Sequence, residues 1–313
     1  MTSTRFHTPV MLGRVIEVLQ PSPDKVFLDG TVGGGGHAAA LLEQTAPNGR
    51  LIGLDVDDES LAEAGGQLAR FGERVRLVRA NFANMKAACQ SEGVTAVDGV
   101  LMDLGGSSHQ FDTPERGFSF REDGPLDMRQ DRRLGRTAAD ILAESSEEEL
   151  VRIFRIYGEE PLAKWLAVAV VQERARQPIT RTVQLAELVK RVKHGGHRSM
   201  HPATLVFQAL RIAVNDELDQ LRRGLEAAVE LCRPGGRIAV IAFHSLEDRI
   251  VKDFMRRMSS PCVCPPGLPV CRCGQRQRLR LVQRKAFKPT EAEVAANPRA
   301  RSARLRAAEK FGE

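Results

Sequence analysis

The chain has 313 residues, of which 42% are hydrophobic and 27% charged, a composition typical of a globular protein with one large domain and an insertion, or with two modest domains. The longest apolar run, residues 166–171, is far too short to span a bilayer, and the first residues lack the apolar core and small-residue cleavage site of a secretory signal. We therefore expect a cytoplasmic protein rather than a membrane-spanning or exported one.

The net charge of +6 is distributed unevenly along the chain. Residues 272–310 contain 12 Lys and Arg side chains but only three acidic ones, which gives this segment a charge of +9 and leaves −3 for the rest. Clustered positive charge favours a polyanionic partner, because binding of phosphates releases counterions. A solvated basic tail would show the same composition. Within this segment Arg301, Arg304 and Arg306 are the candidate RNA contacts.

Six cysteines occur in a chain without an export signal, so a disulfide framework is not expected. Four of them form the pattern Cys262-x-Cys264-x6-Cys271-x-Cys273 inside a Pro-rich loop. Four thiolates are able to close a tetrahedral zinc site. The usual zinc spacing is C-x-x-C, however, and C-x-C is less common. We therefore expect reduced thiols here and no metal.

The first third of the sequence alternates short apolar runs with helical patterns. A helix is expected over residues 59–70, and strands are expected over residues 26–28, 51–54, 75–78 and 97–102. Such alternation predicts βαβ units and a parallel sheet. The pattern resumes late in the chain, with a helix over 216–232, a turn at Pro234-Gly235-Gly236 and a strand over 237–243.

Between these two parts, residues 137–193 show helical patterns only. A helical domain inserted into an α/β sheet explains this better than two tandem domains, because the late strand would otherwise lack a sheet to join. We therefore predict a discontinuous core formed by residues 1–112 and 206–313. Residues 113–205 are predicted to form the inserted all-helical domain, with a role in recognising an RNA substrate.

A glycine-rich turn, Asp29-Gly-Thr-Val-Gly-Gly-Gly-Gly-His37, follows the first predicted strand and precedes a helix. Glycines let the backbone bend tightly and approach a ligand without side-chain clashes. Asp55 ends the second strand, where a carboxylate can accept both ribose hydroxyls of an adenosine ligand. An NAD-linked dehydrogenase fits these features as a first alternative.

Two features favour a methyl donor over NAD. Asp29 stands ahead of the glycines, where it can bind the amino group of a methionine moiety, whereas dinucleotide sites leave the helix N-terminus free for pyrophosphate. Phe82 follows the third strand, where it can pack on adenine, although a core aromatic would give the same pattern.

The fourth strand ends at Asp103, with Ser107 and Ser108 close behind. The carboxyl ends of parallel strands face the ligand crevice, so these side chains are candidates to meet a methyl acceptor, although a helix cap or turn would also use them. Asp103 is the first candidate to accept a proton from the methyl acceptor. His244 is the second, and a helix-entry role suits it equally well.

Several longer strings resemble one family, the bacterial ribosomal RNA small-subunit methyltransferase H family, and the resemblance extends from about His7 to Lys310. They are His7-Thr-Pro-Val, the glycine-rich turn, Asp103-Leu-Gly with Ser107-Ser108, Arg116-Gly-Phe-Ser-Phe, Leu126-Asp-Met-Arg, Tyr157-Gly-Glu-Glu, Phe207-Gln-Ala-Leu-Arg-Ile, Phe243-His-Ser-Leu-Glu-Asp-Arg and Asn297-Pro-Arg.

The resemblance implies a class I S-adenosylmethionine-dependent methyltransferase, with a Rossmann-like α/β sheet and an inserted all-helical domain. It implies N4-methylation of a cytidine in the decoding region of 16S rRNA, with the small ribosomal subunit as partner. The implied cofactor-binding residues, together with Asp29 and Gly33 from the turn, are Gly35, Gly36, His37, Asp55, Phe82, Asp103 and Gln110. The oligomeric state stays open, with a homodimer as one option.

The family usually has a larger residue at Gly106, Met at Gln130 and Arg at Leu205. These departures leave the donor motifs intact, but the last removes a phosphate contact.

For stacking of the target base we expect Phe118 or Phe120, beside Arg116 and Arg121, because no Asp-Pro-Pro-Tyr-like clamp occurs. A non-catalytic RNA-binding factor is the second alternative; it would keep the basic segment but would need neither the glycine turn nor Asp55.

Overall fold

The computed structural model describes residues 9–193, 201–264 and 270–312. It divides into two compact units, the first formed by residues 1–105 with 218–313 and the second by residues 106–217. His7, at the start of the family-like strings, lies outside the described residues. None of the described helices is long and apolar enough to cross a bilayer.

A seven-stranded sheet forms the first unit, in the order β3-β2-β1-β4-β5-β7-β6. Its strands are β1 (Val26–Asp29), β2 (Arg50–Asp55), β3 (Val75–Arg79), β4 (Val97–Asp103), β5 (Cys232–Ala242), β6 (Leu279–Leu281) and β7 (Arg304–Lys310). The strands β1 to β5 run parallel to one another, whereas β7 runs antiparallel between β5 and β6. The parallel α/β sheet expected from the sequence is confirmed, including the pairing of the late strand β5 with β4.

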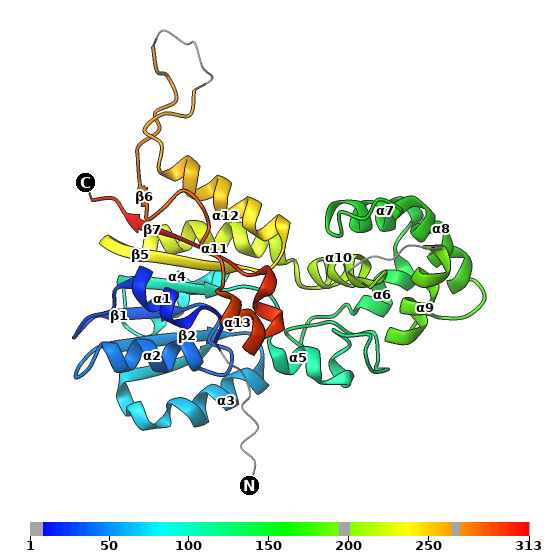
Figure 1. Ribbon diagram of the computed structural model, residues 1–313, viewed down its shortest axis with the longest axis horizontal. Coiled ribbons are helices and arrows are strands. Elements are labelled where there is room, and N and C mark those ends of the chain that lie inside the picture. Colours follow the sequence, from blue (N-terminus) through cyan, green and yellow to red (C-terminus); the bar gives the residue numbers. More distant parts are fainter. Residues whose placement is uncertain (1–8, 194–200, 265–269, 313) are drawn as a thin grey trace. The chain divides into compact units, whose positions relative to one another are not determined.

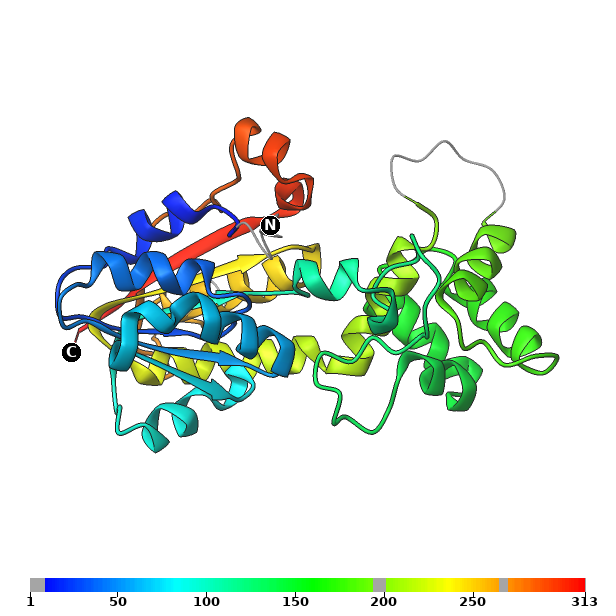
Figure 2. The same ribbon diagram turned by 90° about the horizontal axis from the view of Figure 1, so that it is seen from below.

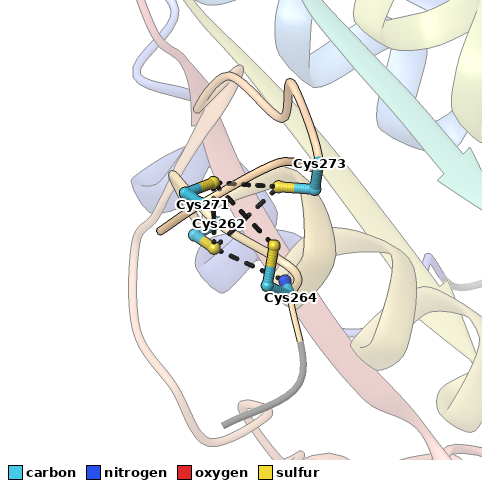
Figure 3. A group of neighbouring side chains, drawn as sticks. All are labelled: Cys262, Cys264, Cys271 and Cys273. Atoms are coloured by element: carbon cyan, nitrogen blue, oxygen red, sulfur yellow. Dashed lines mark hydrogen bonds between the residues drawn. The ribbon is translucent and has the colours of Figure 1, made fainter. Parts of the chain in front are cut away.

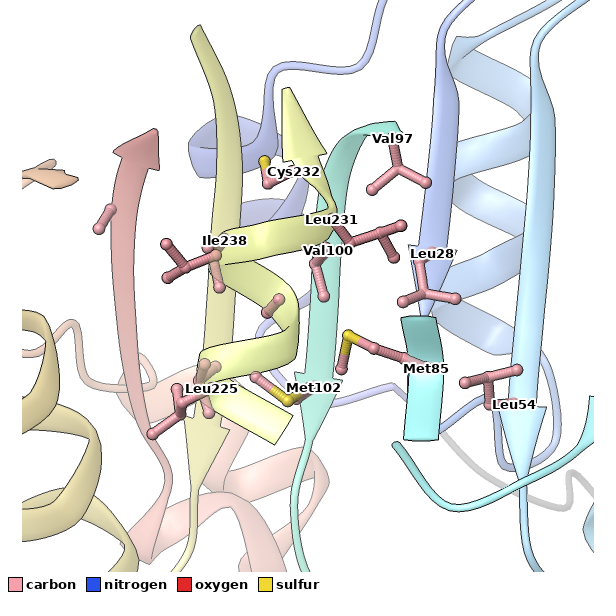
Figure 4. Packing of buried hydrophobic residues seen from close by; sticks show 14 of the residues in the cluster. Leu28, Leu54, Met85, Val97, Val100, Met102, Leu225, Leu231, Cys232 and Ile238 are labelled. Carbon is pink, nitrogen blue, oxygen red and sulfur yellow. The ribbon is translucent and has the colours of Figure 1, made fainter. Parts of the chain in front are cut away.

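Helices cover both faces of this sheet (Figure 1). They are α1 (Leu12–Leu19), α2 (Gly36–Gln44), α3 (Asp58–Leu68), α4 (Met85–Ser91), α11 (Glu217–Leu231) and α12 (Ser245–Met258). The short helix α13 (Glu291–Ala296) has no buried side chain and lies outside both core clusters. Buried side chains of α1, α2 and α3 pack on one face. Those of α4, α11 and α12 pack on the other, where Leu28, Val100 and Ile238 of three neighbouring strands meet Met85 and Leu225 (Figure 4).

The strand β5 begins earlier than expected. Val97 pairs with Cys232 and Gly99 pairs with Arg237, so residues 233–236 loop out between the two pairs. Gly235 has φ +77°, which only glycine adopts readily. The predicted Pro234-Gly235-Gly236 turn is therefore an irregularity within a strand rather than its start.

The described residues of the second unit form helices and loops (Figure 2), with one isolated β-bridge between Pro125 and Arg181. Its elements are α5 (Ser108–Asp112), a 3-10 turn (Pro114–Arg116), α6 (Ala138–Glu144), α7 (Glu147–Ile156), α8 (Ala163–Arg174), α9 (Thr182–Val192) and α10 (Thr204–Asn215). The predicted boundaries at 112 and 205 differ from the observed ones at 105 and 217. The main reason is α10, whose residues Val206, Phe207 and Leu210 belong to the apolar core of the second unit.

Candidate active site

Three carboxylates mark the ends of three neighbouring strands. Asp29 ends β1, Asp55 ends β2 and Asp103 ends β4. These strands stand side by side in the order β2-β1-β4 and run parallel. Their carboxyl ends therefore meet at one edge of the sheet, where α/β proteins bind ligands.

The glycine-rich turn orients one of these carboxylates. The N–H of Gly33 donates to Asp55 Oδ2 at 3.0 Å, and the N–H of Asp57 donates to Asp55 Oδ1 at 3.0 Å. Gly33 and Gly35 have φ of +51° and +90°, and a Cβ on Gly35 would lie 3.2 Å from Leu68. The turn thus needs glycine for its conformation, and it fixes both oxygens of Asp55 while each keeps a further acceptor site.

The start of α2 approaches the N-terminal segment. A Cβ on Gly36 would lie 3.1 Å from Pro9, and the buried His37 Nε2 lies 3.0 Å from the carbonyl oxygen of Val10. Because a carbonyl only accepts, Nε2 carries the proton of this bond. His37 Nδ1 then faces Asp103 Oδ2 at 3.7 Å. His37 therefore connects α2 to the carboxylate at the end of β4.

Burial makes the site unfavourable for negative charge. Desolvation raises the pKa of Asp29 to about 7 and that of Asp55 to about 6, and Asp55 adds repulsion at Asp29. The pKa of Asp103 is raised further above its ordinary value by burial and by the charges of Asp29 and Glu247. Asp103 Oδ1 is buried without a hydrogen-bond partner among the described residues. Such a cluster is matched by a cationic ligand, and it would repel a pyrophosphate.

Two residues of this site were not predicted from the sequence. The N–H of Thr31 donates to Asp29 Oδ1 at 3.1 Å, and its hydroxyl accepts from the N–H of Asp103 at 2.6 Å. Glu247 is 3% exposed and its Oε2 accepts from the N–H of Phe243 at 2.8 Å. The sequence placed Thr31 in the glycine-rich motif, but it did not indicate that Thr31 forms hydrogen bonds with the ends of both β1 and β4.

Phe82 lies beside the site and also in the core. A Cβ on Gly30 would lie 3.0 Å from Phe82 Cβ, and one on Gly224 would lie 2.5 Å from its ring. The side chain is partly buried and packs on the core below the sheet. Phe82 therefore packs in the core, as one of the two interpretations of the sequence expected, and its contact with adenine stays a prediction.

His244 is the N-cap of α12. The N–H of Glu247 donates to His244 Nδ1 at 3.4 Å, and His244 Nε2 lies 3.2 Å from Glu247 Oε1. These contacts show His244 in the helix-entry role that we considered from the sequence, as the N-cap of α12. His244 Nε2 nevertheless has no hydrogen-bond partner among the described residues, so a role for His244 as the second proton acceptor stays a prediction.

Gln110 belongs to the second unit, where it forms a capping box with Ser107 at the start of α5. Its side-chain oxygen accepts from the N–H of Ser107 at 3.1 Å, and its own N–H donates to Ser107 Oγ at 3.2 Å. These bonds give Gln110 a structural role, and its expected contact with the cofactor stays a prediction.

The candidate RNA contacts of the second unit need correction. Arg116 is 1% exposed and donates to the carbonyl oxygens of Arg129 and Gln130 at 3.2 Å. Phe118 is 4% exposed and meets Phe111 edge-on. Both side chains are therefore structural in this unit and are not presented to a base. Phe120 is partly buried and stacks on His201 with ring centroids 4.4 Å apart, whereas Arg121 is exposed.

The basic segment is not a free tail, because it contributes the strands β6 and β7 to the sheet. Arg304 and Arg306 lie on β7. The guanidinium of Arg306 forms two hydrogen bonds with Asp248, of 2.7 and 3.1 Å, and Arg304 donates to the carbonyl of Ala303 at 2.8 Å. Arg306 is thus a structural ion-pair partner, which corrects its assignment as an RNA contact. Arg301 is exposed and remains a candidate.

The sheet order, the glycine turn after β1 and the carboxylate after β2 fit the expected Rossmann-like sheet of a class I S-adenosylmethionine-dependent methyltransferase. The model of the MraW methylase family matches residues 4–311, and the chain belongs to this family. It is therefore a methyltransferase, and its methyl donor is S-adenosylmethionine. Family membership excludes the dehydrogenase and the non-catalytic factor.

Relatives of this chain carry the name ribosomal RNA small subunit methyltransferase H. The protein of Syntrophotalea carbinolica is 56% identical over 96% of both chains. That of Geobacter sulfurreducens is 53% identical over 98% of this chain and 100% of the relative, and that of Heliobacterium modesticaldum is 52% identical over 97% and 98%. The similarity thus covers both units.

Proposed function

We propose that this protein transfers the methyl group of S-adenosylmethionine to N4 of a cytidine in the decoding region of 16S rRNA, with the small ribosomal subunit as partner. The observation that carries the chemistry is the group of three carboxylates at the ends of β1, β2 and β4, of which Asp29 is buried and the other two are partly buried. The names of the relatives, at 52–56% identity over both units, support the choice of RNA.

The residues at this edge fit a methyl donor that carries two positive charges and an adenosine. Asp29 would hold the amino group of the methionine moiety, and Asp55, already oriented by Gly33 and Asp57, would accept the ribose hydroxyls. When bound, the donor supplies a methyl group on a sulfonium, which is activated without a metal or a general acid. Much of the rate would then come from alignment of donor and acceptor.

Asp103 is our candidate for the proton-handling group. The cytosine amine is a poor nucleophile because its lone pair is delocalised into the ring, so an acceptor for one of its hydrogens would localise that pair and later take the proton. Asp103 Oδ1 is buried and without a partner among the described residues. Its raised pKa makes it a stronger base than an ordinary carboxylate once it is ionised.

For RNA binding we retain only side chains that solvent reaches. Arg121 in the second unit and Arg301 in the first are exposed, and each can hold a phosphate without breaking a described internal contact. Phosphate contacts of this kind set affinity and register, whereas the pocket selects the base. The second unit as a whole is our proposed substrate-recognition domain.

Small subunits from a strain that lacks the corresponding gene provide the test. They are incubated with the purified protein and methyl-labelled donor, and the product is mapped by nuclease digestion and mass spectrometry. We expect one N4-methylcytidine in the decoding region, at a rate reduced about 100-fold or more by Asp103→Asn and unchanged by Asp58→Asn on the surface. Methylation of a different base, or only of transfer RNA, would refute the proposed substrate.

A further inference from the structure

The segments that follow α12 and precede β6 form an arm that projects from the sheet (Figure 1), defined here by its described residues, 259–264 and 270–278. Its base is fixed by the N–H of Arg278, which donates to the carbonyl of Met258 at 2.8 Å. None of the described arm residues belongs to the apolar clusters of the sheet or of the second unit. Val263 and Val270 are 47% and 67% exposed. Apolar burial therefore does not explain why the arm holds a defined conformation.

Four thiols come together in this arm, two from the outgoing segment and two from the returning one (Figure 3). The Sγ atoms of Cys262 and Cys271 are 3.4 Å apart, and those of Cys271 and Cys273 are 3.5 Å apart. Cys264 lies 3.9 Å from Cys271, and Cys273 lies 3.9 Å from Cys262. All four sulfur atoms lie within 4.8 Å of one another.

These distances match the edges of a tetrahedron around a zinc ion. With a Zn–S bond of about 2.3 Å, the sulfur atoms of a tetrathiolate site stand about 3.8 Å apart. A pair of disulfides would instead divide the sulfurs into two bonded pairs at about 2.0 Å. In the observed cluster, Cys271 is in contact with each of the three other sulfurs.

Backbone donors around the cluster are suited to thiolates. The N–H of Cys264 donates to Cys262 Sγ at 3.4 Å, and the N–H of Val263 donates to Cys273 Sγ at 3.5 Å. Hydrogen bonds of this kind orient metal ligands and stabilise their charge.

We infer that Cys262, Cys264, Cys271 and Cys273 form a structural Zn²⁺ site that closes the arm. The prediction of no metal rested on the C-x-C spacing, and the geometry favours the opposite. Four ligands fill the tetrahedral coordination shell and leave no position for a substrate, so the ion would stabilise the arm and take no part in methyl transfer. The binding energy of the metal would replace the apolar core that the arm lacks.

The first experiment measures metal in the full-length protein, purified under reducing conditions with zinc supplied during expression. Elemental analysis should give about one zinc ion per chain. The double variant Cys262→Ser/Cys271→Ser should retain less than about a tenth of it, whereas Val263→Ala, which changes an exposed side chain between two ligands, should retain all of it. Replacement by Co²⁺ should give thiolate-to-metal charge-transfer bands in wild type and Val263→Ala only.

Two readouts separate loss of the metal from loss of the fold. The cysteines lie outside the apolar clusters and the carboxylate site, so the double variant should keep its circular dichroism spectrum and its affinity for S-adenosylmethionine. Trypsin should cleave after Arg272, between two of the ligands, about tenfold faster in the variant than in the zinc-loaded wild type. The single variant Cys264→Ser provides a second, milder removal of a ligand.

Three results would overturn the inference. One is wild-type protein with less than about a tenth of an equivalent of zinc and four thiols that alkylate freely. Another is a pair of disulfides in protein alkylated before lysis. The third is zinc that the double variant retains at the wild-type level.

Discussion

The hydroxyl of Thr31 accepts a 2.6 Å hydrogen bond from the backbone N–H of Asp103. This bond connects the turn after β1 to the last residue of β4, and it holds the candidate proton acceptor next to Asp29, to which the N–H of Thr31 donates. Thr31→Val removes the acceptor and leaves a buried N–H unsatisfied, which should lower the free energy of unfolding by about 1–3 kcal/mol. Denaturant unfolding measures this change, and Thr31→Ser, which keeps the hydroxyl, should restore most of it.

Asp55 is the candidate ribose ligand. Asp55→Ala should weaken S-adenosylmethionine binding by about 2–3 kcal/mol, or roughly 30- to 150-fold, because two charge-assisted hydrogen bonds are lost. Calorimetric titration tests this value. The matched control is Asp58→Ala, which removes a nearby carboxylate whose ion pair with Arg79 is on the surface. Equal affinity of Asp55→Ala and wild type would contradict the assignment.

Binding of the donor should depend on pH. In the free protein the pKa is about 7 for Asp29 and about 6 for Asp55, so both are partly protonated between pH 5 and 7. A cationic ligand favours the ionised forms, and binding in this range should therefore release protons. We expect affinity to rise from about pH 5 to pH 7.5 and then to level off. Calorimetry in buffers of different ionisation enthalpy measures the number of protons released on binding. If Asp29→Asn releases as many protons as wild type, the protons come from a group other than Asp29.

The same pKa shift affects stability in the absence of ligand. Since the folded-state pKa of Asp29 is raised from 3.8 to about 7, the folded state favours the protonated carboxyl. The contribution of Asp29 to the free energy of unfolding is fully present below about pH 4. It is progressively lost as the pH rises through 7, and the total loss amounts to up to about 4 kcal/mol. Asp29→Asn should thus be more stable than wild type at pH 8, with little difference at pH 4. Thermal unfolding at both pH values makes the comparison, and a variant that is less stable at pH 8 would contradict it.

Arg301 and Arg306 should differ in their effects although both lie in the basic segment. Arg306→Ala breaks two hydrogen bonds with Asp248 and should lower the free energy of unfolding by about 1–3 kcal/mol. Arg301→Ala should leave the unfolding unchanged, raise the apparent KM for rRNA and reduce the slope of log affinity against log salt by roughly 0.7–0.9. Identical salt slopes for Arg301→Ala and wild type would assign this residue, too, to a structural role.

The sequence was sufficient to predict the sheet and the carboxylates at its edge because both depend on local patterns. Apolar runs followed by Asp29, Asp55 and Asp103 gave the strand ends, and parallel pairing brings such ends to one edge. What depended on contacts between distant residues was missed. Arg116 looked like an RNA contact because an arginine is normally solvated, and only the carbonyls of Arg129 and Gln130 show that it is buried.

The C-terminal segment illustrates the same limit. Its composition is that of a basic tail, but alternate residues of β7, such as Leu305 and Ala307, are buried and the strand fills a place between β5 and β6. Charged residues at the intervening positions hid this pattern. For the cysteines, the spacing along the chain did not reveal that the sulfur atoms of the two C-x-C pairs lie close together.

The adjacency of β4 and β5 has a consequence for synthesis of the protein. The whole second unit separates these two strands in the chain, so β4 emerges from the ribosome long before the strand that covers its edge. During that interval the second unit, which has its own apolar core, can fold first and bring the two ends of its segment together, which shortens the loop that β4 and β5 must close. A lesion in the helical unit should therefore slow the folding of the sheet and prolong the exposure of an aggregation-prone edge, even where the mature enzyme tolerates it.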